Sequence, residues 1–295
     1  MKIFKYISVL SLFLTLSACV DPIQIKLDAG SKLIVIDAFI NNLRETQKIR
    51  VTNSDSYFSG KKADPVSNAI IVLSDMTMNT NYTFNYTGNG NYEFALGATD
   101  TIARPNHSYK LSITIDGSEY TALTEQKRGA SIEGITAELN NGTNGELGAV
   151  GDFYYCFLVA KDKADANTDY YWIKTFRNDT LFADPQDLNI VTDGTGGSVS
   201  DLPPAVDSLY FTPTGTLLGS KRYQSSDRCK VEIHSLTKPC RDFLLQAAAQ
   251  VSNGGLFATT PENVRTNFVA PATAVKVVGW FNMSTVAVKT RQVAK

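Results

Sequence analysis

The run KLIVIDAFI (residues 32–40) decides the interpretation of the fold, because it is short, apolar and dominated by Ile and Val. A run of this length that is rich in β-branched residues is typical of a buried β-strand, whereas a buried helix needs a longer stretch. We therefore expect a β-rich domain that uses residues 32–40 as a core strand.

More strand-like segments follow this run, with turn signals between them. The Asp116-Gly117 pair predicts a type I′ hairpin, because both central residues of such a turn need a positive φ. Strands spaced by roughly ten to fifteen residues, without helical periodicity, favour an antiparallel sandwich. We therefore expect residues 32–128 to form an N-terminal immunoglobulin- or transthyretin-like β-sandwich. Its further strands are predicted at 47–53, 69–75, 81–87, 92–96, 108–115 and 119–125.

A second β-rich unit is predicted over residues 129–295. Its first part, 129–151, is rich in Gly and Asn and predicts a loop or a hinge. The aromatic runs 152–162 and 169–176 predict a long hairpin. Later strands are predicted at 208–213, at 230–236 and as a pair within 274–290 that is joined near Asn282.

One helix is predicted near the C-terminal end, at about 239–252. Thr237 is a suitable N-cap, Pro239 fits the first turn, and Asn253-Gly254-Gly255 ends the helix. The predicted fold class is therefore mainly β, with two antiparallel β-sandwich-like units and a single helix.

The first residues predict a lipoprotein signal peptide at 1–18. Lys2 and Lys5 precede an apolar run at 7–16, which is shorter than the roughly 20 residues of a membrane-spanning helix. The run ends in Leu-Ser-Ala-Cys, the bacterial lipoprotein pattern, in which the Cys19 thiol receives a diacylglyceryl group and the new amine an acyl chain such as palmitate. Several acyl chains anchor a protein stably. We expect lipid attachment at Cys19, followed by a tether at 19–31.

The residues after Cys19 predict the membrane. An Asp in the second mature position retains lipoproteins in the inner membrane of many bacteria, but here Val20 takes that place and Asp21 follows it. We expect an outer-membrane anchor, with the protein facing the cell surface rather than the periplasm.

The composition favours a folded chain and argues against a nucleic-acid partner. Hydrophobic residues make up 43% of the chain and charged residues 19%, which is unlike a disordered chain. Without Lys2 and Lys5, 26 basic residues stand against 29 acidic ones, a net charge of −3. This balance gives no electrostatic attraction to nucleic acid, and we expect no nucleic-acid partner.

Three cysteines remain after Cys19, namely Cys156, Cys229 and Cys240. An odd number cannot form a complete set of disulfides. A predicted strand between Cys229 and Cys240 would place them about 20 Å apart, too far for a bridge. We expect free or partly paired cysteines without a redox role.

The sequence offers little material for catalysis. It contains two histidines and no nucleophile elbow, zinc helix, Walker loop or Rossmann glycine pattern. His107 lies in a Pro-Asn-His-Ser turn and is expected to be exposed. His234 alternates with Val231 and Ile233 and is expected to be solvent-facing or hydrogen-bonded. We predict no enzymatic activity, no catalytic residues and no cofactor.

Two features near the predicted hairpin are candidate binding sites. Asp165, Asn167 and Asp169 alternate as in a calcium loop, but the following Gly and the distal Glu are missing, so a polar hairpin tip is the simpler interpretation. Tyr170, Tyr171 and Trp172 are the candidate ligand or partner surface, although consecutive strand residues point to opposite faces and about half should be core. A Gly- and Ser-rich loop, Asp193 to Pro204, is a further candidate.

Several weak motifs in a fixed order carry a family resemblance. They are KLIVIDAFINN with Asp37, QKIRVTNSDSYFSGKKADPVSNAIIVLSD with Ser54 to Tyr57, Pro65-Val66 and Ala69, then GNGNYEF, FATTPENVRTNF (257–268) and VVGWFNMSTV (277–286). Together they resemble an uncharacterised outer-membrane lipoprotein family of Bacteroidota, catalogued as a domain of unknown function. Its members are often encoded beside SusC-like TonB-dependent receptors, and the family offers no catalytic residues to carry over.

The anchor, the neutral β-rich body and the resemblance together predict a function. We expect a non-enzymatic accessory or ligand-binding subunit of a TonB-dependent (SusC-like) nutrient uptake system, with the β-barrel receptor as its partner. The alternatives are a structural or adhesive surface protein and a hydrolase with an unrecognised site, because sandwiches host all three functions.

Overall fold

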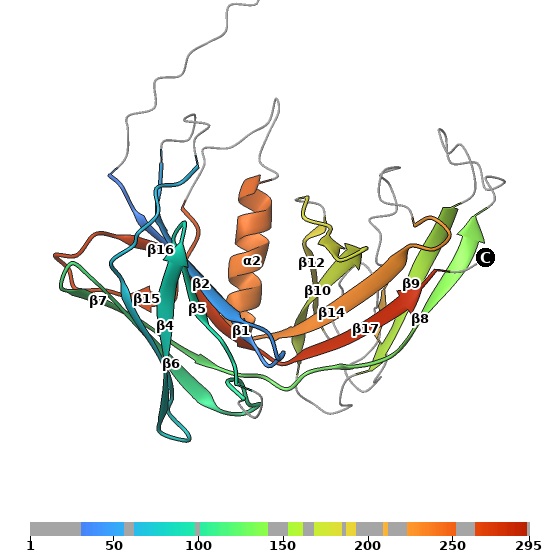
Figure 1. Cartoon of the computed structure of the whole chain (residues 1–295), viewed down its shortest axis with the longest axis horizontal. Coiled ribbons are helices and arrows are strands. Elements are labelled where there is room, and N and C mark those ends of the chain that lie inside the picture. The colour runs from blue at the N-terminus through green and yellow to red at the C-terminus, as the bar shows by residue number, and fades with distance from the viewer. Residues whose placement is uncertain are drawn as a thin grey trace, which may run out of the picture. The chain divides into compact units, whose positions relative to one another are not determined.

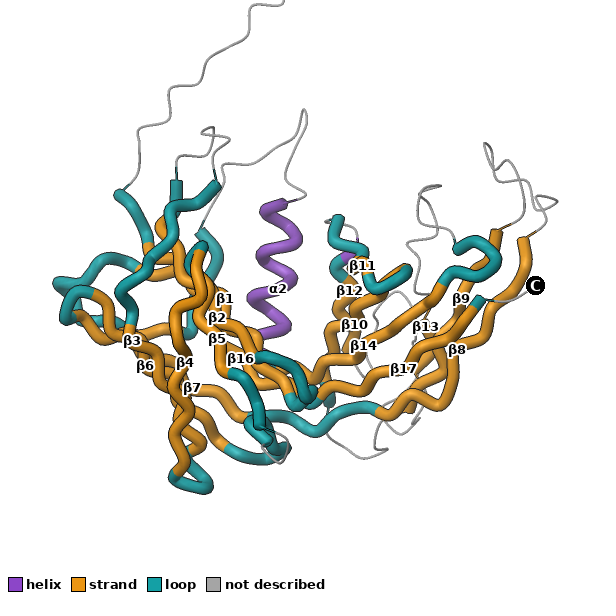
Figure 2. The backbone as a smooth tube through the Cα atoms, viewed as in Figure 1, coloured by secondary structure: helices purple, strands orange, loops and turns teal. Residues whose placement is uncertain are grey.

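Strands dominate the structure, a computed structural model that describes residues 31–55, 62–97, 101–140, 153–161, 168–184, 187–192, 209–211, 223–251 and 263–293 (Figures 1 and 2). Residues Lys32–Lys295 group into one compact unit. The mainly β fold with one helix near the C-terminal end is confirmed. No helix in the described part of the chain is both long and apolar enough to cross a membrane.

The first sheet has nine strands in the order β15-β7-β6-β3-β4-β5-β2-β1-β16. Every one of these strands contributes to a single apolar core, which is sandwich-like as predicted. Buried and half-buried residues alternate along β6, because successive side chains of a strand point to opposite faces. The strands are β1 (Ile34–Asn41), β2 (Gln47–Asn53), β3 (Ile70–Asp75), β4 (Thr80–Gly88), β5 (Asn91–Phe94), β6 (Ser108–Ile115), β7 (Ser118–Glu125), β15 (Phe268–Val269) and β16 (Val277–Ser284).

The hairpin between β6 and β7 agrees with its sequence signal. Asp116 has φ 48° and Gly117 has φ 79°, so both residues have the positive φ of a type I′ turn. Ile115 pairs with Ser118 directly across this turn. The predicted hairpin is therefore confirmed.

A parallel strand pair joins the two ends of the described chain, and the sequence did not predict it. β16 runs parallel to β1 with Ile36 opposite Gly279, and the two strands lie side by side in Figure 1. A Cβ on Gly279 would lie 1.9 Å from the Ile36 carbonyl oxygen, and Gly279 has φ +106°. Residues predicted to belong to the C-terminal unit thus contribute two strands to the first sheet, β15 and β16. Whether 32–128 and 129–295 are separate domains stays a prediction.

Two further sheets enclose a second core. A five-stranded sheet has the order β11-β10-β14-β17, with β12 paired to β10, and a three-stranded sheet has the order β13-β9-β8. In Figure 1 the long strands β14 and β17 run side by side. The strands are β8 (Ser131–Asn140), β9 (Phe153–Lys161), β10 (Tyr170–Arg177), β11 (Thr180–Leu181), β12 (Asn189–Thr192), β13 (Leu209–Phe211), β14 (Arg228–Leu236) and β17 (Val286–Gln292).

Two sequence predictions in this region are wrong. The long hairpin of 152–162 with 169–176 does not form, because β9 and β10 belong to different sheets. Cys156 on β9 and Ile173 on β10 instead meet in the same core, so the strands pack face to face rather than edge to edge. The predicted loop at 129–151 contains strand β8, whose register shifts between Ile132 and Gly134. Such an irregularity interrupts the two-residue period that would have indicated a strand.

Helix α2 spans Lys238–Val251, close to the predicted 239–252. The Cys240 amide donates a hydrogen bond to Thr237 Oγ1 at 3.3 Å, which confirms Thr237 as the cap. Phe243 stacks on Trp280 of β16 with ring centroids 5.0 Å apart. Leu236, Cys240, Phe243, Leu244 and Trp280 form a third buried cluster, which fixes the helix against the strands.

The chain passes from the first sheet to the five-stranded sheet at Thr285, between β16 and β17. The Thr285 amide donates to Ser235 Oγ at 2.8 Å, and the Ser235 amide donates to the Thr285 carbonyl at 3.0 Å. Thr285 Oγ1 also donates to the Lys127 carbonyl at 2.6 Å. These hydrogen bonds tie the end of β14 and the segment after β7 to the crossing point.

Candidate functional site

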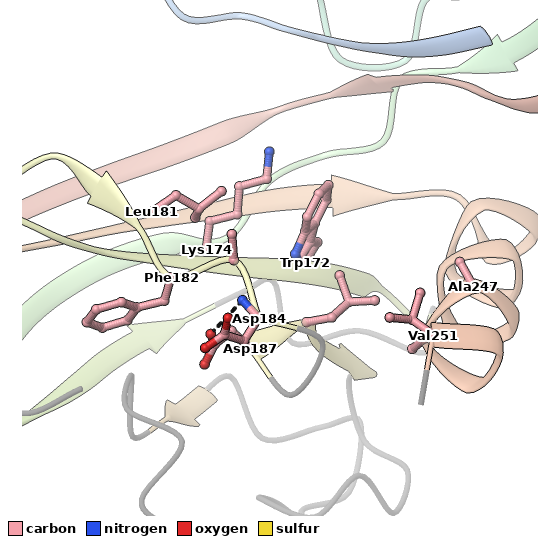
Figure 3. A pocket seen from close by; sticks show the side chains of 11 residues that line it. Trp172, Lys174, Leu181, Phe182, Asp184, Asp187, Ala247 and Val251 are labelled. Carbon is pink, nitrogen blue, oxygen red and sulfur yellow. Dashed lines mark hydrogen bonds between the residues drawn. The ribbon is translucent and has the colours of Figure 1, made fainter. Parts of the chain in front are cut away.

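A pocket of about 270 Å³ lies between strand β10, the segment after β11 and helix α2. Figure 3 shows Trp172 and Lys174 on the strand, Ala247 and Val251 on the helix, and Asp184 beside Asp187. The Asp184 amide donates to Asp187 Oδ2 at 3.0 Å, which holds these two residues together. We call this site the α2 pocket; its lining is Trp172, Lys174, Leu181, Phe182, Ala183, Asp184, Asp187, Leu188, Ala247, Ala248 and Val251.

The alternation of β10 explains which side chains reach the pocket. Tyr171 and Ile173 point into the core between the second and third sheets and are fully buried. Trp172 and Lys174 therefore occupy the opposite face. The predicted aromatic surface is thus divided: Tyr171 is core, and Trp172 lines the pocket. Tyr170 packs against the cluster around α2, with the Arg241 guanidinium 5.9 Å from its ring centroid.

Trp172 has an aromatic partner and a cationic partner. Its ring meets Phe39 of β1 edge-on, with centroids 5.7 Å apart at 75°. The Lys174 ammonium lies 4.0 Å from its ring centroid. Edge-to-face pairs and cation–π contacts both orient an indole ring. The indole is therefore held in place rather than free to rotate.

A group of ionisable residues adjoins Lys174 on the same face. Lys174 is opposite Glu232 in the register of β10 and β14, and Trp172 is opposite His234. Glu232 binds the Lys230 ammonium at 2.9 Å and His234 Nε2 at 3.0 Å. Asp37 of β1 also interacts electrostatically with Lys174. We call this set, Asp37, Lys174, Lys230, Glu232 and His234, the charged cluster.

Burial shifts the pKa values of the charged cluster. It lowers the pKa of Lys174 and raises that of Asp37, although the opposite charges of these two groups counteract both shifts. Burial lowers the pKa of His234 to about 4, so this imidazole is neutral at pH 7. Burial also opposes ionisation of Glu232, but hydrogen bonds with His234 and Lys230 outweigh it and lower the pKa of Glu232 to about 2. Opposite charges and hydrogen bonds within the charged cluster thus offset the cost of burying its ionised groups.

The chemistry of the α2 pocket suits non-covalent recognition. A fixed indole face, aliphatic walls from the helix and a few polar groups at the margin are typical of small-molecule sites. The consecutive aromatic residues Tyr-Tyr-Trp indicated Trp172 as a site residue from the sequence alone. They did not indicate Lys174 or the residues of α2 that also line the pocket. The signal for Lys174 was its place in the strand, since a lysine alternates there with Ile173 and Thr175, which are buried.

The other predicted site residues are partly described. Asp165, Asn167, Cys19 and the loop from Asp193 to Pro204 lie outside the described residues. Asp169 is buried, and its Oδ2 lies 2.7 Å from Arg128 Nε and 2.5 Å from Arg128 Nη2. Its carboxylate therefore faces a guanidinium. The described residues contain no group of three or more His, Cys, Asp and Glu that could hold a metal ion.

Both histidines are largely buried and interact with a carboxylate. His107 was predicted to be exposed, but its side chain is 19% exposed and its Nδ1 lies 2.8 Å from Asp75 Oδ2. That prediction is wrong because the turn folds over the buried Asp75, whose Oδ1 also accepts hydrogen bonds from the Thr77 and Met78 amides. For His234 the hydrogen-bonded alternative is confirmed.

The cysteines fit their sequence interpretation. Cys156, Cys229 and Cys240 are all free and buried. Cys229 belongs to the second core and Cys240 to the cluster around α2, so these two do not pair.

The fold and the pocket define a mainly β protein with a small apolar recess beside helix α2. The chain belongs to the family described as a domain of unknown function, DUF4249, whose model matches residues 20–290. No curated protein matches it. Among solved structures, it is similar to the chicken CNTN1 FN1–FN3 domains with 8% identity and a TM-score of 0.23. That alignment covers 70% of this chain and 63% of the other chain's length, and it carries no argument about function.

Proposed function

We propose that this protein is an outer-membrane-anchored lipoprotein that acts as a non-enzymatic, ligand-binding accessory of a TonB-dependent (SusC-like) uptake system. The α2 pocket is the observation that carries the proposal, because it provides a fixed aromatic face and aliphatic walls on a rigid β-framework. Sites on rigid elements keep their geometry better than sites on loops.

Family membership supports the proposal from a second direction. The match to DUF4249 over residues 20–290 agrees with the resemblance drawn from the sequence motifs. That resemblance implies an origin in Bacteroidota and a SusC-like receptor as the partner. The leader ending in Leu-Ser-Ala-Cys19 supports a lipid anchor, with the body facing the cell surface.

Lipid anchoring gives a physical reason for an accessory role. A domain confined to the membrane plane meets a β-barrel at a high effective concentration, so that even a weak contact is well populated. A ligand held in a shallow pocket could then be passed to the barrel without leaving the membrane surface. The near-neutral mature chain has no strong electrostatic attraction to anionic lipid. Lipid headgroups therefore do not compete with the β-barrel for the surface of the protein.

The first experiment is purification of the tagged lipoprotein from its native outer membrane in mild detergent, with partners identified by mass spectrometry. We expect a stoichiometric TonB-dependent barrel. Recovery of the protein alone, while a Cys19→Ala variant is merely released from the membrane, would contradict the proposal and favour a structural or adhesive role.

A matched pair of variants connects the pocket to uptake. Trp172→Ala removes the aromatic face of the pocket, whereas Val288→Ala removes an exposed side chain on β17, outside the pocket. We expect slower nutrient-dependent growth for Trp172→Ala only, at equal amounts of protein in the membrane. Equal growth of both variants would separate the pocket from transport.

A further inference from the structure

Two buried thiols meet inside the second core. Cys156 lies on β9 and Cys229 begins the buried part of β14, and these strands belong to different sheets. Both side chains are fully buried and belong to the same core cluster. Their side chains interact directly through a hydrogen bond. The third described cysteine, Cys240, lies in the separate cluster around α2.

A tyrosine fixes the spacing between the two sheets at this point. The backbone of Tyr223 pairs with Tyr154 of β9: the Tyr154 amide donates to the Tyr223 carbonyl at 2.8 Å, and the Tyr223 amide donates to the Tyr154 carbonyl at 3.4 Å. Its hydroxyl donates to the Phe176 carbonyl of β10 at 3.2 Å. The same side chain also hydrogen-bonds with Cys229. Tyr223 therefore spans the core beside the thiols and keeps the sheets at a fixed separation.

Thiols in contact need only a small movement to form a bond. A disulfide has an S–S distance of about 2 Å, so two sulfurs in hydrogen-bond contact must approach by an ångström or two. Bonds that join the two sheets of a sandwich are well known in β proteins, where they cross the core between facing strands. Contact with Cys229 raises the pKa of the Cys156 thiol, and neither sulfur is exposed. An oxidant in solution therefore cannot reach either thiol in the folded protein.

We propose that Cys156 and Cys229 form an inter-sheet disulfide when the chain folds in an oxidising compartment. This inference uses the export that the proposed function includes, because cytosolic thiols stay reduced. The bond forms by exchange with a disulfide-bearing oxidant before the core closes. The two thiols lose two protons and two electrons to form the S–S bond, and the oxidant's disulfide is reduced to two thiols.

The bond would join the three-stranded sheet covalently to the five-stranded sheet. It would close a loop of about 70 residues, which includes the lining of the α2 pocket contributed by β10 and the segment after it. Cys240 offers a built-in comparison, because it is buried at the same level and has no cysteine partner in its cluster.

The test is refolding of the chain, in a Cys19→Ala background, from the reduced unfolded state in a buffer of oxidised and reduced glutathione. The product is denatured, alkylated and mapped by mass spectrometry. We expect a linked peptide pair containing Cys156 and Cys229, with Cys240 alkylated. Alkylation of both Cys156 and Cys229 in folded protein, or a bond to Cys240, would overturn the proposal.

A stability measurement guards against variants that fold poorly. We expect the urea midpoint of the oxidised chain to exceed that of the reduced chain, and we expect Cys240→Ala to keep this difference. Cys229→Ala should abolish the difference between oxidising and reducing conditions, whatever its absolute midpoint. Since refolding takes place in vitro, the result does not depend on where the protein resides, so failure of the export proposal and failure of the disulfide are distinguishable.

Discussion

The first core and the face that carries the α2 pocket are built on opposite principles. The first core is a continuous apolar cluster to which all nine strands contribute. The outer face of β10 and β14 instead carries Lys174, Glu232 and His234, with Trp172 among them. A framework follows simple patterning, while a site departs from it and needs compensating partners. The candidate site therefore lies where the strands depart from simple apolar patterning and bury charged side chains.

The largest expected effect concerns the parallel pair that closes the first core. Gly279→Val places a side chain 1.9 Å from the Ile36 carbonyl and at a positive φ, so we expect a loss of more than about 3 kcal/mol in the free energy of unfolding. Urea denaturation measures it. Gly134→Ala is the control, because a Cβ there meets nothing within 4 Å. Equal stability of the two variants would show that β16 does not complete the first sheet.

The next effect concerns His234 in the charged cluster. Its pKa is about 4 in the folded protein and near 6.5 when unfolded, so below pH 6.5 the unfolded chain binds more protons. The stability contributed by the neutral imidazole is complete above pH 6.5 and is lost as the pH falls to about 4. We expect this loss to reach about 2–3 kcal/mol. Urea midpoints between pH 7 and 4 measure it.

Comparison with a variant isolates this titration from that of the carboxylates. His234→Gln keeps a hydrogen-bond donor for Glu232 but cannot take up a proton in this range. We expect its stability to fall less steeply than that of the wild type between pH 6.5 and 4. Below pH 4.5 both proteins should lose the contribution of Glu232, whose pKa is about 2 when folded. Parallel curves above pH 4.5 would mean that His234 is not held neutral.

The sequence predicted the first core better than the second, for physical reasons. Strands β2 and β6 match their predicted bounds because their side chains alternate between core and surface. The parallel partner of β1 could not be predicted, because strand pairing over so long a separation leaves no local signal. Strand β8 was missed for a different reason, since its register shift disturbs the alternation.

The candidate site divides in the same way. Trp172 was identified because three consecutive aromatic residues are conspicuous in a strand. Its position in a pocket depends on helix α2 and on the segment at Asp184, which only the tertiary structure brings to it. The contact between Cys156 and Cys229 was likewise hidden, because the two residues are far apart in the sequence and lie on strands of different sheets.

A smaller effect tests the histidine–carboxylate pair of the first sheet. Asp75 is fully buried, contacts His107 and accepts hydrogen bonds from two backbone amides. Burial alone would raise the pKa of this carboxyl, but these contacts outweigh burial and lower it. We expect Asp75→Asn to lower the free energy of unfolding by about 1–2 kcal/mol, because the amide keeps part of this network. Thermal unfolding measures it, with Asp116→Asn as an exposed control. A loss as large as that of Gly279→Val would place this pair among the main determinants of the fold.

The smallest effect on stability is expected at the residue that matters most for recognition. Trp172 is only partly buried, and it packs at the edge of the cluster around α2, beside Phe39, Lys174 and His234, rather than in the second core. We expect Trp172→Ala to cost about 1–2 kcal/mol, well below the 3–5 kcal/mol typical of a buried tryptophan. Phe281→Ala, in the first core, is the matched comparison because its side chain is fully buried. If Trp172→Ala were as destabilising as Phe281→Ala, the indole would be a structural residue, and the α2 pocket would lose its strongest claim to bind a ligand.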